Sequence, residues 1–134
     1  MRHTLRKKDI LRGYGAYQEV FAGGEVFAEK QMKIIVLREE NKVDDQMLKI
    51  GFAVGNRLRS AVARNRLKRR MREIVRIHKN VLVQQCIDGK ISRLIFLCLP
   101  IKNRIDVRAC PNYTELEREF FQILPRLSSI KGKK

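Results

Sequence analysis

The stretch ARNRLKRRMREIVRIHK, at residues 63–79, decides how this chain of 134 residues folds. Its apolar residues recur three and four positions apart, which is the spacing of side chains on one face of an α-helix. The apolar stripe consists of Ala63, Leu67, Met71 and Ile74. We therefore expect a long helix over residues 61–83, capped at its N-terminus by Ser60, that packs on the rest of the fold through this stripe.

The opposite side of this helix is expected to be strongly basic. Residues 57–79 contain ten Lys and Arg residues but one acid, Glu73. A helix face that only contacts water usually alternates acids and bases, because like charges one turn apart destabilise the helix. We therefore predict an unneutralised cationic strip, reaching Lys79, that binds the phosphates of a polyanion. Its residues are Asn65, Lys68, Arg69, Arg72, Arg76 and Lys79, with Arg64 and Arg66 at its borders.

The chain as a whole is also basic. It carries 30 Lys and Arg residues against 14 Asp and Glu residues, a formal charge of +16. Such an excess attracts either nucleic acid or an acidic membrane surface. We favour nucleic acid and expect no membrane partner, because no apolar run approaches the roughly 18 residues that a membrane span needs.

The N-terminal segment and the cysteines indicate a cytoplasmic protein. The first residues, MRHTLRKKDILRG, are basic and lack the apolar segment of a signal peptide. The three cysteines, Cys86, Cys98 and Cys110, have neither the paired spacing of a zinc site nor the even number expected of disulfides. We expect reduced cysteines and no bound metal, with Cys98 packed inside a strand.

A short helix and two strands are predicted before the basic helix. Residues 14–22 carry apolar side chains three and four positions apart, and the pair Gly23-Gly24 would end that helix. Strands are expected at residues 29–38 and 48–55, the second with alternating apolar residues. The polar segment EENKVDDQ between them predicts a solvated hairpin loop.

A strand and a last helix are predicted after the basic helix. The run LIFLCL at residues 94–99 has the length and apolar character of a central strand that is covered on both faces. Thr114 and Glu117 have the spacing of a capping box that would begin the last helix, and Pro125 would end or kink it. The inner stripe of this helix is expected at Leu116, Phe120 and Ile123.

The order of these elements, α-β-β-α-β-α, predicts an α/β sandwich of the α+β class, with helices packed on a small central sheet. The length suits a single domain over residues 1–134. Within it, residues 1–12 would form a basic N-terminal extension and residues 128–134 a basic C-terminal tail.

The central segment resembles a known family. GFAVGNRLRSAVARNRLKRRMRE, at residues 51–73, is similar to the signature region of the protein subunit of bacterial ribonuclease P, whose arginine-rich motif matches residues 64–73. AYQEVFAGG, at residues 16–24, resembles the first helix of that family, and the order of elements agrees. The resemblance implies an α/β sandwich with a left-handed β-α-β crossover, although such crossovers are generally right-handed.

The resemblance also implies a function. In this family the protein binds a large catalytic RNA, and the two together remove the 5′ leader of precursor tRNA. The RNA, with bound Mg²⁺, hydrolyses the phosphodiester, so we expect no catalytic residue, metal ligand or cofactor in the protein itself. The sequence agrees, because it lacks a carboxylate cluster or a His pair suited to hydrolysis. The nearest candidates, Asp44 and Asp45, lie in the polar loop.

Two RNA-binding sites are implied by the resemblance. The leader would lie between the first helix and the open face of the sheet, where Tyr17 and Phe21 would stack on bases. Lys33 and Lys49 would hold the leader phosphates. The alternative is that Tyr17 and Phe21 simply belong to the core. The residues implied for the catalytic RNA are Arg57, Arg59, Arg64, Asn65, Arg66, Lys68, Arg69, Arg72 and Arg76.

Some positions depart from the family pattern, and two other functions remain open. Asn56 stands where a cation is common, Arg59 where a glycine is common, and Ile35 where an aromatic residue is common. A ribosomal or ribosome-assembly protein would share the charge, the size and the basic helix. A DNA-binding helix-turn-helix protein would need a short helix directly before the basic helix, whereas a strand is predicted there.

Overall fold

The computed structural model describes residues 7–44, 46–55, 61–99 and 111–128. Within these ranges the chain has a mixed α+β fold, with a four-stranded sheet and four α-helices, so the predicted fold class is confirmed. The helices are η1 (Lys7–Asp9, a 3-10 turn), α1 (Tyr14–Gly23), α2 (Ala61–Ile77), α3 (Lys79–Asp88) and α4 (Tyr113–Leu127). The strands are β1 (Glu25–Ala28), β2 (Met32–Arg38), β3 (Lys49–Val54) and β4 (Ile91–Cys98).

β4 lies inside the sheet, whose order is β1-β2-β4-β3. It pairs antiparallel with β2 and parallel with β3. The predicted central strand is confirmed, since Ile95 and Phe96 point to opposite faces and both are fully buried. The predicted hairpin between residues 29–38 and 48–55 is wrong, because β4 separates these two strands. A strand that is apolar on both faces is best covered when it has a neighbour on each side. The connection is not wholly solvated either, since Val43 is buried.

β1 and β2 form the hairpin of the sheet, and the sequence pattern missed β1. The strand predicted to begin at residue 29 begins at Met32. Most side chains of β1 are exposed, so no alternation of apolar residues marks this strand. Glu119 of α4 stabilises the hairpin connection. Its buried carboxylate accepts hydrogen bonds from the backbone N–H groups of Gln31 (2.9 Å) and Met32 (2.8 Å).

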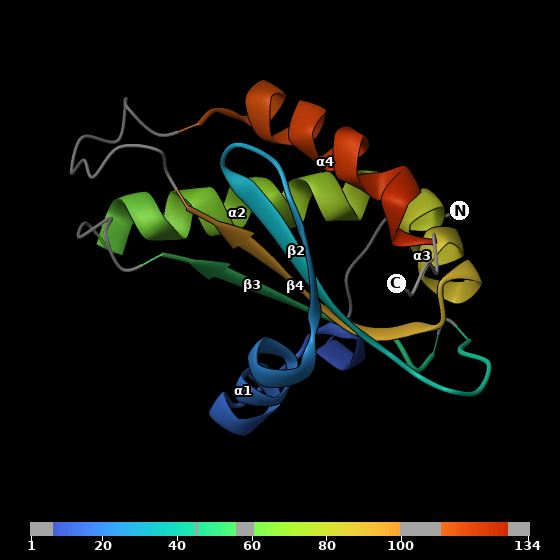
Figure 1. The fold of residues 1–134 in the computed structure, drawn as a ribbon. Helices are drawn as coiled ribbons and strands as arrows, with labels where there is room; N and C mark the ends of the chain where they lie inside the picture. Colours follow the sequence, from blue (N-terminus) through green and yellow to red (C-terminus); the bar gives the residue numbers. More distant parts are fainter. Residues whose placement is uncertain (1–6, 45, 56–60, 100–110, 129–134) are drawn as a thin grey trace.

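Helices cover both faces of the sheet (Figure 1). α2, α3 and α4 pack on one face, around the larger of two cores. α1 packs on the opposite face, over a smaller core that contains Leu11, Val20, Ile35 and Ile95. Successive residues of a strand point to opposite faces, which is why one sheet supports two cores. The basic helix α2 and the short helix α1 therefore lie on opposite sides of the sheet.

The single helix predicted over residues 61–83 is two helices, α2 and α3, separated by a turn at His78. The His78 Nε2 atom lies 2.7 Å from a carboxylate oxygen of Glu117, and its ring stacks on Phe120. Both partners belong to α4, so the local apolar pattern gave no sign of the break. Together α2 and α3 connect the parallel strands β3 and β4. The left-handed course of this connection stays a prediction.

The last helix begins two residues earlier than its predicted capping box implies. Asn112, not Thr114, is the N-cap: its side chain accepts a hydrogen bond from the backbone N–H of Glu115 (2.9 Å), whose carboxylate accepts one from the backbone N–H of Asn112 (3.0 Å). Glu117 binds His78 instead. Pro125 lies inside the helix, which continues to Leu127. The predicted inner stripe of Leu116, Phe120 and Ile123 is buried, which confirms that prediction.

Candidate nucleic-acid interface

The predicted buried stripe of α2 is confirmed. Ala63, Leu67, Met71 and Ile74 are each at most 1% exposed and belong to the larger core. Burial of one large apolar side chain contributes roughly 1.5–3 kcal/mol, so this stripe strongly favours one rotation of the helix about its axis. The remaining side of α2 consequently faces solvent.

The first part of the solvent side carries several exposed or partly exposed polar and basic residues. Asn65, Arg66 and Arg69 are exposed and Lys68 is partly exposed. Among the described residues, Arg66, Lys68 and Arg69 form no ion pair with an acid. Arg72 is exposed, and its guanidinium lies 5.4 Å from the centre of the Phe52 ring, a cation–π contact. It too forms no ion pair with an acid in the described part of the chain. The open cationic face, as we name it below, comprises Asn65, Arg66, Lys68, Arg69 and Arg72.

The C-terminal end of the strip differs from this face. Arg76 forms an ion pair with Glu73, and the hydrogen bond between them lowers the pKa of Glu73 and raises the pKa of Arg76. Lys79 lies 3.0 Å from a carboxylate oxygen of Asp9, which is 6% exposed. The predicted unneutralised strip is therefore wrong at this end, because acids of the chain itself neutralise it. A contact of Arg76 with RNA stays a prediction.

Other basic residues around α2 have different roles. Arg57 and Arg59, predicted to extend the surface, lie outside the described residues. Arg64 is partly buried at the start of the helix. Arg70, which was not predicted as a functional residue, donates a hydrogen bond to the carbonyl oxygen of Pro111 (2.6 Å). It thereby joins α2 to the segment before α4.

Tyr17 and Phe21 of α1 differ in their surroundings. The backbone N–H of Phe52 donates a hydrogen bond to the Tyr17 hydroxyl (3.2 Å), and the Tyr17 ring covers Gly51 so closely that a Cβ atom there would lie 2.7 Å from the hydroxyl oxygen. A glycine within a strand often marks such a close approach. Tyr17 thus packs against the smaller core, as the alternative interpretation expected, yet stays partly exposed. Phe21 is 40% exposed, with its ring centre 6.5 Å from that of Tyr17.

The pairing of the strands defines the sheet face below α1. Three rows of neighbouring residues cross it: Lys33–Leu97–Ala53, Ile35–Ile95–Gly51 and Leu37–Arg93–Lys49. α1 lies over the middle row, and Glu19 on one of its flanks forms an ion pair with Arg93. Tyr17 and Phe21 lie on the other flank, because about 100° of rotation per residue places them across the helix from Glu19.

The two lysines predicted to hold the leader lie at opposite corners of this sheet face. Lys33 is in the row on the flank of Tyr17 and Phe21, and it is partly exposed, as are its neighbours Leu97 and Ala53. The α1 surface, as we name it below, comprises Tyr17, Phe21, Lys33, Ala53 and Leu97. Lys49 lies beside Arg93 on the other flank, where its ammonium donates a hydrogen bond to the carbonyl oxygen of Lys8. Lys33 therefore lies on the same flank of α1 as Phe21, and Lys49 lies on the other flank.

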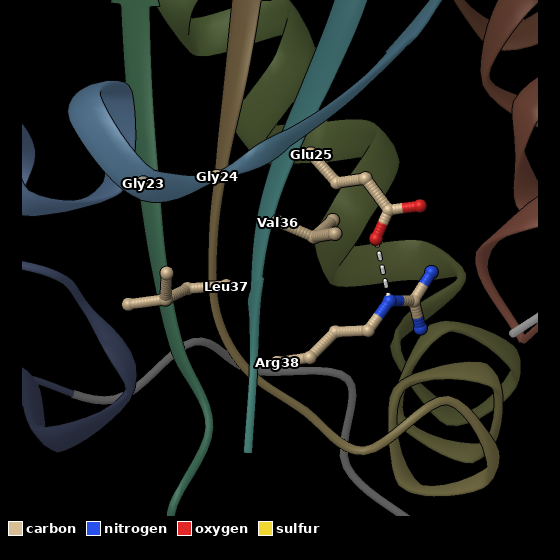
Figure 2. Close-up of a pocket in the computed structure, with 6 residues that line it drawn as sticks. All are labelled: Gly23, Gly24, Glu25, Val36, Leu37 and Arg38. Carbon is tan, nitrogen blue, oxygen red and sulfur yellow. Dashed lines mark hydrogen bonds and ion pairs between the residues drawn. The ribbon is translucent and has the colours of Figure 1, made fainter. Parts of the chain in front are cut away.

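A hollow at the end of α1, shown in Figure 2, is lined by Gly23, Gly24, Glu25, Val36, Leu37 and Arg38. Arg38 donates a hydrogen bond to Glu25 (2.7 Å) and two more to the carbonyl oxygens of Gly89 (2.6 Å) and Leu127 (3.0 Å). Its guanidinium thus joins β1, the turn before β4 and the end of α4. These structural contacts make the hollow a poor candidate for binding an anion.

Metal-ligand clusters and membrane spans are absent from the part of the chain that the structure describes. No three His, Cys, Asp or Glu side chains come together there to hold a metal ion. Asp44 accepts hydrogen bonds from the backbone N–H groups of Gln46 (3.0 Å) and Met47 (3.1 Å), so it stabilises a local turn. Asp45 is not among the described residues. In the same ranges no helix has the length and apolarity to cross a bilayer. The cytoplasmic location stays a prediction.

Comparison with known proteins decides the family. A family model described as ribonuclease P matches residues 5–127 of this chain. The chain belongs to the ribonuclease P family. The resemblance seen in the arginine-rich motif is thereby confirmed for nearly the whole chain, and the ribosomal alternative is not favoured.

Relatives and solved structures agree with membership of the ribonuclease P family. The ribonuclease P protein component of Finegoldia magna is 27% identical over 130 residues, which cover 97% of this chain and 100% of that protein. The component of Symbiobacterium thermophilum is 37% identical over 73 residues, 54% of this chain and 61% of that protein. The ribonuclease P protein of Staphylococcus aureus superposes with a TM-score of 0.64 at 17% identity, covering 92% of this chain and 98% of that one. This last similarity supports the fold.

Proposed function

We propose that this chain is the protein subunit of a bacterial ribonuclease P and that its open cationic face binds the catalytic RNA. One observation carries the proposal. Among the described residues, Arg66, Lys68 and Arg69 have no acid partner, yet they project from a helix whose other side is buried in the core. Repulsion between these cations is relieved when phosphates neutralise them. A rigid helix also presents them with little loss of conformational entropy.

The α1 surface is proposed to hold the 5′ leader of precursor tRNA. Phe21 offers an exposed aromatic ring and Lys33 a cation on the same flank of α1. Stacking of one base on an aromatic side chain contributes roughly 1–3 kcal/mol whatever the base, which suits leaders of varied sequence. Mature tRNA lacks the leader, so this contact would favour the substrate over the product.

The protein is proposed to contribute binding, while the catalytic RNA performs hydrolysis with Mg²⁺. Buried acids of the described part of the chain have structural partners: Glu119 holds the β1–β2 hairpin and Asp9 pairs with Lys79. The proposal therefore assigns the chain no catalytic residue and no metal of its own. Its expected partners are the catalytic RNA and precursor tRNA, and neither DNA nor a membrane is among them.

Reconstitution tests the proposal. The protein is mixed with a bacterial ribonuclease P RNA and precursor tRNA at low Mg²⁺, and removal of the 5′ leader is followed. We expect stimulated cleavage and an affinity for the catalytic RNA that falls steeply with salt, by roughly 0.7–0.9 in log K per neutralised phosphate for each unit of log salt. No stimulation, combined with co-sedimentation of the protein with ribosomal subunits, would instead identify the ribosomal alternative.

A further inference from the structure

Tyr14 is more exposed than any other large apolar side chain among the described residues, at 81%. It is the first residue of α1 and follows Gly13, whose backbone has a φ of 95°. A single exposed tyrosine is common on protein surfaces and requires no function by itself. Its position relative to Phe21 is what gives Tyr14 significance.

Tyr14 continues the aromatic flank of α1. It precedes Phe21 by seven residues, so the two side chains point within about 20° of each other and lie about 10 Å apart along the helix. Tyr17 lies between them along the axis and covers Gly51 of β3. Since Gly23 at the other end of α1 lies near Leu37 of β2, the aromatic flank runs across the sheet and reaches β3, which is an edge strand.

The surroundings of Tyr14 favour a nucleic acid over an apolar partner. Arg12, two residues earlier in the chain, is exposed. The first turn of α1 contains no acid that would repel a phosphate. Exposed aromatic rings next to cations are the combination with which proteins bind single-stranded nucleic acid, because rings stack on bases and cations hold phosphates.

We propose that Tyr14 is a further stacking position for the leader, beyond Phe21, with the exposed Arg12, two residues before Tyr14, available to the phosphates next to the base that stacks on Tyr14. This inference rests on the proposed binding of the leader to the α1 surface. A separation of about 10 Å corresponds to roughly three nucleotides at the 3.4 Å spacing of stacked bases, and to fewer where the strand is extended. Tyr14 and Phe21 would therefore contact bases two or three nucleotides apart.

Leader length provides the test. Holoenzymes are reconstituted with wild-type protein, Tyr14→Ala, Tyr14→Phe, Phe21→Ala and, as a matched control, Phe121→Ala, which removes an aromatic ring that is 43% exposed on α4. Affinity is measured for mature tRNA and for precursors whose leaders grow one nucleotide at a time. We expect Tyr14→Ala to weaken binding of long-leader precursors by about fivefold or more, the lower limit for one base–aromatic stack. Tyr14→Phe should retain wild-type affinity.

The leader lengths at which the two effects begin decide the outcome. Onsets for Tyr14→Ala and Phe21→Ala that differ by two or three nucleotides support the inference. The inference is overturned if the Tyr14→Ala holoenzyme binds precursors of every leader length as tightly as the Phe121→Ala control does. It is also overturned if the effects of Tyr14→Ala and Phe21→Ala begin at the same leader length. If Phe21→Ala also has no effect, binding of the leader to the α1 surface fails as well, so the two failures are distinguishable.

Discussion

The two ends of the basic strip on α2 have the same residue types but different partners. Towards the N-terminus, Arg66, Lys68 and Arg69 meet no acid among the residues that the structure describes. Towards the C-terminus, Arg76 pairs with Glu73, and Lys79, just beyond the turn at His78, pairs with Asp9. A count of basic residues treats these ends alike. The contrast shows that some cations of a basic helix serve the fold and others remain available to phosphate.

The largest expected effect tests this contrast directly. Arg66→Ala combined with Arg69→Ala should weaken binding of the catalytic RNA by about 100-fold, because each charge-assisted hydrogen bond contributes about 1.5–3 kcal/mol. The control, Arg76→Ala, should weaken it by about threefold or less, since Glu73 already neutralises that cation. Filter binding at constant salt measures both. If Arg76→Ala weakened RNA binding as much as the double variant, the ion pair with Glu73 would not make Arg76 less available to RNA.

The pair between Asp9 and Lys79 should matter for stability and not for RNA binding. Asp9→Asn leaves the partly buried ammonium of Lys79 without its charged partner and should lower the free energy of unfolding by about 2 kcal/mol. Glu25, the carboxylate partner of Arg38, is more exposed than Asp9. Glu25→Gln should therefore lower the free energy of unfolding by about 1 kcal/mol or less. Urea denaturation measures both variants. The contrast would fail if Asp9→Asn changed RNA affinity but not the unfolding midpoint.

The two aromatic side chains of α1 show a similar contrast: Tyr17 packs over Gly51, whereas Phe21 is exposed. In Gly51→Ala, the added Cβ atom would clash with the Tyr17 ring and displace it. We expect this change to lower affinity for precursor tRNA by about fivefold. Affinity for mature tRNA should not change. Gly23→Ala is the matched control, because a Cβ atom there would make an ordinary contact of 3.7 Å with Leu37. Unchanged precursor affinity in the Gly51→Ala holoenzyme would mean that the position of Tyr17 is irrelevant to the leader.

The smallest expected effect comes from removing the acid at the C-terminal end of the strip. Glu73→Gln removes the acid that neutralises Arg76 and should raise affinity for the catalytic RNA by about two- to fivefold. The slope of log K against log salt should become steeper by up to about 0.9 if Arg76 gains a phosphate. Glu40→Gln, in an exposed loop, changes the net charge equally and should have less effect. A larger gain for Glu40→Gln would point to net charge, not to Arg76.

Most of the fold could be predicted where the pattern is local. The stripe on α2, the strand β4 and the inner stripe of α4 were all readable from the spacing of apolar residues. β1 was missed because its exposed side chains form no apolar pattern. The break at His78 and the hairpin contact of Glu119 were missed because both depend on α4, far along the chain. The separation of β2 from β3 depends on β4, which begins only at Ile91, after two intervening helices.

The sequence by itself determined that this chain has an amphipathic basic helix, that the helix packs through Ala63 and Leu67, and that the motif resembles the ribonuclease P family. The pairing of Glu73 with Arg76, three positions apart on one helix, was also local, but the predicted unneutralised strip overlooked it. Tertiary structure alone decided that Asp9 neutralises Lys79, that Tyr17 covers Gly51 and that Lys49 lies away from Phe21. The reason is physical: spacing along a helix or strand defines its faces, whereas neighbours far apart in sequence meet only once those faces have packed.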